Sequence, residues 1–122
     1  MTQSPKRKYD LEERTAKFGE DVIKLCKNLK QDAVSRPIIS QLVRSATSVG
    51  ANYAEANGAS SKLDFRNKIH IAKKELQETK HSLRMLKACF PDQSDAVEPI
   101  WKENQELLFI FQKITNSLRS SR

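Results

Sequence analysis

The segment VRSATSVGANYAEANG, Val43 to Gly58, has the spacing of an α-helix but lacks the charged surface that most helices carry. Arg44 and Glu55 are its only charged residues, in a chain in which 30% of the residues are charged. Gly50 lies in its interior, where a glycine costs about 1 kcal/mol relative to alanine. Because small side chains surround this glycine, another backbone can approach closely. We therefore expect this helix to be covered on two faces.

Two stripes of side chains run along this helix, which the pattern begins at an N-cap at Ser35 or Arg36 with Pro37 in the first turn and ends at Asn57 and Gly58. One stripe is apolar and typical of a face that packs on a core: Ile39, Leu42, Ala46, Val49, Tyr53 and Ala56. The other stripe would be exposed in a lone bundle, yet it is small or polar: Gln41, Ser45, Ser48, Asn52 and Glu55. Together with Arg44, this second stripe is the predicted interface with another subunit.

Three further segments have the spacing of helices, over about residues 10–29, 61–90 and 95–118. Each begins at a capping box, in which a residue at the helix start pairs with one three positions later: Asp10 with Glu13, Ser61 with Asp64, and Asp95 with Glu98. Four heptad-patterned helices joined by short loops predict an all-α fold, an antiparallel up-down-up-down four-helix bundle. The bundle spans residues 10–118, between a mobile basic tail at 1–9 and a short tail at 119–122.

The fourth predicted helix contains LLFIF, Leu107 to Phe111, which is apolar all round. One core-facing side cannot absorb all five residues, and a chain of 122 residues has little else to cover them. This surplus favours self-association. The alternative is a monomer in which the second helix crosses its neighbours tightly and the tails cover the surplus.

The third predicted helix carries most of the net charge of +7, with eight Lys or Arg residues against three acids. A straight line of mostly basic residues follows each core position by one, and we call it the basic ridge: Arg66, His70, Lys73, Gln77, Lys80, Arg84 and Lys87. At helical rise the ridge is about 30 Å long. Phosphates would meet it favourably, so Arg66, Lys73, Lys80, Arg84 and Lys87 are the predicted nucleic-acid-binding residues. The alternative is the ordinary lysine-rich outer face of a soluble bundle.

Residues that would carry catalysis, a metal ion or a cofactor are not found together in this sequence. His70 and His81 are eleven residues apart on one helix, about 16 Å, and cannot share a metal ion. We expect no catalytic residue, metal or cofactor, and hence no enzyme. No apolar run is long enough for a membrane span and the N-terminus does not resemble a secretory signal, which predicts a cytoplasmic protein with Cys26 and Cys89 as buried, reduced thiols.

The second helix resembles the signature of the four-helix-bundle family of 23S rRNA intervening-sequence proteins, which read close to P…QLRRSAVSIPANIAEG. The matching positions are Gln41, Leu42, Arg44, Ser45, Ala46, Ser48, Ala51, Asn52, Ala54 and Glu55. The stretch from Phe65 to Ala88 is similar to the family's third helix. Gly50 stands where proline is common in the family, and Ala56 where glycine is common.

The resemblance implies a bacterial homo-oligomer, commonly a ring-like homopentamer. It also implies kinship with the accessory variability determinant proteins of diversity-generating retroelements, which are basic pentamers that bind nucleic acid and a reverse transcriptase. We therefore expect a non-catalytic oligomer that binds RNA or DNA through the basic ridge. The alternative is a protein–protein interaction scaffold, docking a reverse transcriptase or another partner without contacting nucleic acid.

Overall fold

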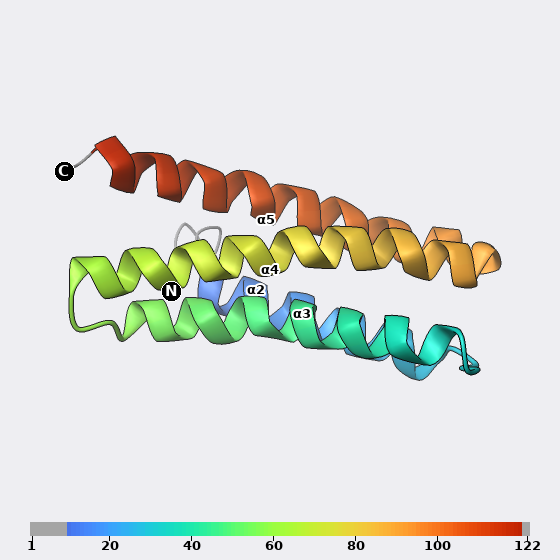
Figure 1. The fold of residues 1–122 in the computed structure, drawn as a ribbon. Helices are drawn as coiled ribbons and strands as arrows, with labels where there is room; N and C mark the ends of the chain where they lie inside the picture. Colours follow the sequence, from blue (N-terminus) through green and yellow to red (C-terminus); the bar gives the residue numbers. More distant parts are fainter. Residues whose placement is uncertain (1–9, 121–122) are drawn as a thin grey trace, which may run out of the picture.

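The computed structural model describes residues 10–120, and every element in that range is helical. Four long helices follow one another (Figure 1): α2 (Leu11–Lys27), α3 (Ser35–Asn57), α4 (Lys62–Cys89) and α5 (Ser94–Ser120), with the 3₁₀ turn η1 (Pro91–Gln93) before α5. The predicted all-α class with four helices is confirmed. The predicted N-terminal tail and residues 121–122 lie outside the described residues, and α5 extends two residues past the predicted bundle boundary at 118.

Two of the predicted helix starts are formed by the residues expected to cap them. The Asp10 carboxylate accepts the backbone N–H of Glu13 at 3.1 Å, and the Ser61 hydroxyl oxygen accepts that of Asp64 at 3.0 Å. Each side chain satisfies a donor in the first turn that has no partner inside the helix. The capping signals therefore locate the starts of α2 and α4 correctly.

Helix α3 begins differently, because its first turn is held by a residue of the preceding loop. The Asp32 carboxylate accepts the backbone N–H groups of Ser35 at 2.9 Å and Val34 at 3.0 Å. The Ser35 hydroxyl oxygen accepts the N–H of Asp32 in return, at 3.0 Å. These hydrogen bonds, those with Ser35 first, lower the pKa of Asp32.

The helices surround the core in chain order. Helix α3 packs against both α2 and α4, α4 packs against α5, and contact between α2 and α5 is sparser. The pairs Glu55–Lys68 and Ser45–Thr79 run in opposite order along α3 and α4. Figure 1 shows α5 lying along α4 and drawing away from it toward the C-terminal end.

The apolar positions that the heptad pattern assigns to the interior form one core. Fully buried side chains come from all four helices: Phe18, Val22, Leu42, Val49, Ile69, Leu76, Leu83, Leu86, Leu107 and Phe111. The Tyr53 and Phe111 rings form a T-shaped pair with the centroids 5.8 Å apart, which joins α3 to α5. Aromatic pairs in this geometry add to the stabilisation that burial provides.

The close approach expected at Gly50 is present, but its partner is helix α2 of the same chain. A Cβ atom at Gly50 would lie 3.3 Å from the carbonyl carbon and oxygen of Thr15. One at Gly19 would lie 3.4 Å from the Cα atom of Thr47. The lack of side chains at both glycines lets α2 and α3 pack closely, so for Gly50 the structure favours the alternative of a tight crossing within one chain.

The two cysteines lie in different surroundings, and both are free. Cys26 is buried in the core, and burial raises the pKa of its thiol to about 11. Cys89, in the last turn of α4, is half-buried. The predicted burial is therefore right for Cys26 and wrong for Cys89, whose position at a helix end leaves one side open.

Asn104 is a buried polar residue in the middle of the apolar seam of α5. Its side chain has no exposed surface, and its amide nitrogen donates to the backbone carbonyl of Leu76 at 3.2 Å. The amide oxygen Oδ1 has no hydrogen-bond partner among the described residues. Burying such an oxygen without a partner is unfavourable. The hydrogen bond to α4 nevertheless ties α5 to one register, as expected for a polar residue at a seam position.

Replacing Asn104 with leucine is expected to raise the free energy of unfolding by about 1–2 kcal/mol, because it removes the unpartnered oxygen and keeps the buried volume. Urea denaturation followed by circular dichroism measures the change. Asn104→Ala is the matched control and should be destabilising, since it leaves a cavity. A lower stability of Asn104→Leu than of the parent would show that the amide stabilises the core.

Candidate nucleic-acid interface

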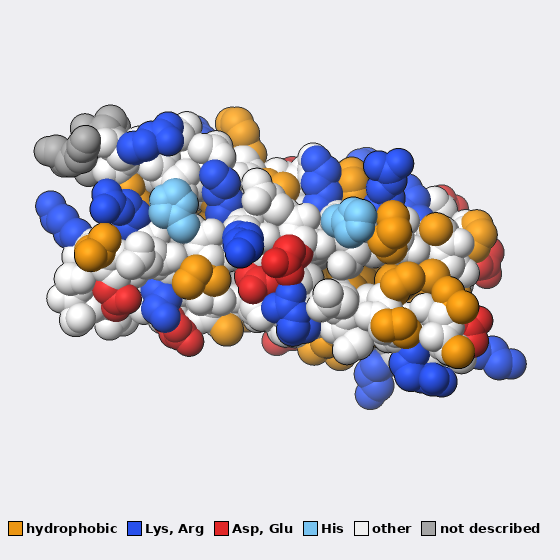
Figure 2. Space-filling model, viewed as in Figure 1, with side chains coloured by type: hydrophobic (Ala, Val, Ile, Leu, Met, Phe, Trp, Pro, Cys, Tyr) orange, Lys and Arg blue, Asp and Glu red, His pale blue; other side chains and the backbone are white. Residues whose placement is uncertain are grey.

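The structure brings all seven residues of the basic ridge to one side of α4. His70, Gln77 and Arg84 are exposed, while Arg66, Lys73, Lys80 and Lys87 are half-buried. Half-burial is typical of long basic side chains whose stems lie along apolar surface while the charge reaches water. Figure 2 shows Lys, Arg and His side chains following α4 along the length of the molecule.

The ridge borders helix α5. The Nζ atom of Lys80 lies 5.7 Å from the centre of the Trp101 ring, which α5 contributes half-buried. A cation over an indole face is a favourable contact. The pattern of α4 alone could not reveal this ring, because Trp101 belongs to α5. The one sequence feature that could have indicated its place is that Trp101 follows the buried Ile100 by one residue, as each ridge residue follows a core residue on α4.

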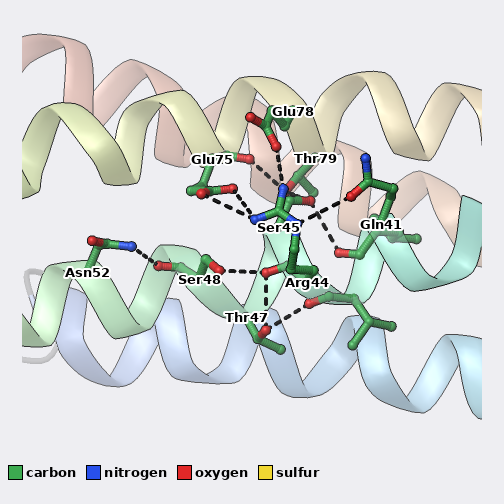
Figure 3. Close-up of polar contacts among 11 residues, drawn as sticks. Gln41, Arg44, Ser45, Thr47, Ser48, Asn52, Glu75, Glu78 and Thr79 are labelled. Carbon is green, nitrogen blue, oxygen red and sulfur yellow. Dashed lines mark hydrogen bonds and ion pairs between the residues drawn. The ribbon is translucent and has the colours of Figure 1, made fainter.

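The acidic residues in the middle of α4 lie on its other side, against α3. Arg44 of α3 donates to Glu75, with Nη1 3.3 Å from Oε1, and also to Glu78 (Figure 3). Hydrogen bonding to Glu75, more than to Glu78, raises the pKa of Arg44. Glu55, the other charged residue of this segment of α3, forms an ion pair with Lys68 of α4 at 2.8 Å.

The acidic residues in the middle of α5 are engaged in the same way, by helix α2. Arg14 donates to Glu103 at 2.6 Å and to Glu106 at 2.7 Å. These hydrogen bonds, the one to Glu103 foremost, raise the pKa of Arg14 above its ordinary value. These four carboxylates in the middle of α4 and α5 are thus held by arginines of α3 and α2 and do not pair with the ridge cations.

Comparison with known proteins agrees with this architecture. The sequence pattern described as 23S rRNA-intervening sequence protein matches residues 7–113. The chain belongs to that family. A crystal structure of a protein of unknown function from the S23 ribosomal protein family of Bacteroides thetaiotaomicron matches it with a TM-score of 0.75 and 30% identity, covering 85% of this chain and 96% of the other. No curated protein matches the chain.

In this intervening-sequence protein, the α3 residues predicted to face another subunit lie mainly beside α4. Ser45 is 1% exposed, and its hydroxyl oxygen accepts a hydrogen bond from Thr79 at 2.8 Å. The prediction that Ser45 belongs to an outward stripe is wrong. Its position one residue before the core residue Ala46 turns it toward α4, which completes the bundle there.

The other predicted interface residues have polar groups that are engaged within the chain (Figure 3). The Ser48 hydroxyl donates to the Arg44 carbonyl at 2.7 Å, and the Asn52 amide donates to the Ser48 carbonyl at 2.9 Å. Gln41 is exposed and accepts from Arg44 at 3.3 Å. None of these contacts requires a second copy, so the subunit interface at Gln41, Arg44, Ser48, Asn52 and Glu55 stays a prediction.

Residues 10–120 of this family member offer little for other kinds of site. That range contains no group of three His, Cys, Asp or Glu side chains placed to hold a metal ion. No helix in the described part of the chain combines the length and apolar character that crossing a membrane requires. His70 and His81 are both exposed. The basic ridge is therefore the candidate on which a function is proposed.

Proposed function

We propose that this intervening-sequence protein is a non-catalytic homo-oligomer that binds RNA or DNA through the basic ridge of α4. The observation that supports this most is the sorting of charge around the bundle. Arg44 and Arg14 engage the acidic residues in the middle of α4 and α5 on the far sides of those helices. The ridge cations consequently have no carboxylate partner among the ion pairs of residues 10–120.

A straight line of cations suits a polyanion better than a small anion. The ridge spans 21 residues of one helix, about 30 Å, and so can meet several phosphates of a nucleic acid at once. Each phosphate that is neutralised releases condensed counterions, which drives binding. The ridge has no exposed aromatic side chain on which a base could stack, and this favours contact with the phosphate backbone over reading of the bases.

Self-association would strengthen the binding, because copies of the ridge held in one assembly act together. Phe109 of α5 supports assembly, since it is 65% exposed although it lies within the apolar run of residues 107–111. Large exposed apolar side chains in a patch are typical of an interaction surface. By family resemblance, the proposed assembly is a pentamer-like ring of antiparallel bundles.

Titrating a fluorescent RNA duplex and a DNA duplex of the same sequence at 50 and 200 mM salt tests the binding. If all five basic ridge residues contact phosphates, affinity should fall roughly 500-fold over this range. An uncharged morpholino oligomer of the same sequence is the control and should not bind. Absence of binding at 50 mM salt would refute the nucleic-acid role and leave the scaffold that docks a protein partner.

Assembly is tested by light scattering on the purified full chain. A mass several times the 14.0 kDa of one chain is expected, and it should persist in high salt, because burial of apolar surface does not depend on ion pairing. A single-chain mass at high protein concentration would contradict self-association.

A further inference from the structure

An apolar patch lies on the side of the bundle where α2 and α5 are only sparsely in contact. It surrounds a groove of about 560 Å³ whose walls include Leu11, Ile110, Ile114 and Phe109. Phe109 is the most exposed of these, and the Nζ atom of Lys113 lies 5.4 Å from the centre of its ring. The patch therefore presents an aromatic side chain with a positive charge beside it.

A second apolar groove, of about 210 Å³, lies on the adjacent side of the bundle between α2 and α3. Gly19, Gly50, Ala51 and Ile23 are among the residues that line it. A cavity of about 150 Å³ is enough to hold benzene, so this groove has room for a phenyl ring. Glu20, which is exposed, lies among the lining residues.

We infer that Phe109 of one copy packs into the α2–α3 groove of a second copy, with Lys113 of the first placed near Glu20 of the second. Shape and charge both match: an exposed ring beside a cation meets an apolar groove beside a carboxylate. The inference rests on the self-association proposed above and assigns it to surfaces other than the α3 stripe predicted from the sequence. A phenylalanine moved from water into such a groove is the kind of anchor that dominates interfaces.

Contact between these two unlike sides would be head-to-tail. Because the two sides are adjacent and share α2, successive copies turn in one direction, and such a head-to-tail contact forms a closed ring when the rotation between neighbours closes. Helix α4 lies across the core from α2. The shared helix α2 then faces the ring axis, and the basic ridge of α4 lies on the outer rim, where a nucleic acid can reach it.

Two single substitutions, one in each surface, test the inference. Phe109→Asp removes the ring and keeps the groove, while Ala51→Arg blocks the groove and keeps the ring. Each variant alone should have the mass of one chain by light scattering. An equimolar mixture should form heterodimers only, since just one productive contact per pair remains.

The matched control for Ala51→Arg is Ser48→Arg, three residues away on the α4 side of α3, and it should leave assembly intact. Circular dichroism checks that each variant is folded. Lys113→Glu should raise the dissociation constant at least about tenfold, and adding Glu20→Lys to it should restore the parent value.

The outcomes separate the inference from the proposed function. If the parent chain is a monomer, this inference and the proposed self-association both fail, and the nucleic-acid role is decided by the titration alone. If the parent assembles and Phe109→Asp or Ala51→Arg assembles equally well, the inference is wrong and self-association stands. If only Ser48→Arg prevents assembly, the α3 stripe is the interface. A mixture of the two variants that stays monomeric would also overturn the head-to-tail contact.

Discussion

Reversing the charge at Lys73, Lys80, Arg84 and Lys87 to glutamate is expected to reduce affinity for an RNA or DNA duplex at least about 100-fold at 100 mM salt. Each phosphate that the variant no longer neutralises should also lower the slope of log affinity against log salt by about 0.9, or about 3.6 for all four. The variant replaces four positive charges with four negative ones, so its net charge changes from +7 to −1. Fluorescence anisotropy at several salt concentrations measures both quantities.

A control must separate the position of the charge from its amount. Reversing four exposed cations in the last turn of α2, the following loop and the first turn of α3 gives the same net charge: Lys24, Lys27, Lys30 and Arg36. This control should weaken binding through the long-range field alone and should retain the salt slope of the parent. Equal reductions of affinity and slope in both variants would mean that the net charge, and not the ridge, attracts the nucleic acid.

The largest loss of stability is expected for Phe111→Ala. Phe111 is fully buried, and its ring forms a T-shaped pair with that of Tyr53 of α3. Removing the ring leaves a cavity that the surrounding helices fill only partly, and such substitutions lower the free energy of unfolding by about 3–5 kcal/mol. Urea denaturation monitored at a fixed protein concentration measures this value.

Phe111→Leu provides the graded comparison, because it keeps most of the buried volume and should be destabilised less than half as much. The effect of Phe111→Ala should appear in every probe of folding if the bundle unfolds as one unit. A decrease below about 1 kcal/mol would show that α5 contributes little to the stability of the core.

The helices and the core could be predicted from the sequence because both depend on local patterns. Heptad spacing selects the buried side of each helix, and the side chains of Asp10 and Ser61 cap the first turns within their own segments. The start of α3 expected at Ser35 or Arg36 is close to the true start at Ser35, but the residue that holds its first turn is Asp32, in a loop that has no apolar period.

The two flanks of each core stripe could not be predicted in the same way. Whether a residue beside the stripe faces solvent or a neighbouring helix depends on the order of helices around the core, which a single helix does not encode. Two examples are Ser45, which is buried against Thr79, and Trp101, which lies beside Lys80. For the same reason, the pairing of Arg44 with Glu75 and Glu78, which occupies these two carboxylates, is apparent only in the fold.

The contact of Arg14 with Glu103 and Glu106 also bears on how the chain folds. Successive helices meet after short loops, whereas this contact joins residues 89 and 92 positions apart. Bringing such distant residues together in a flexible chain costs roughly 4 kcal/mol of chain entropy, apart from a constant. That cost falls steeply once α3 and α4 have formed a hairpin that brings the outer helices near each other. We therefore expect the ion pairs of Arg14 with Glu103 and Glu106 to form in the last step of folding and to hold helices α2 and α5 together.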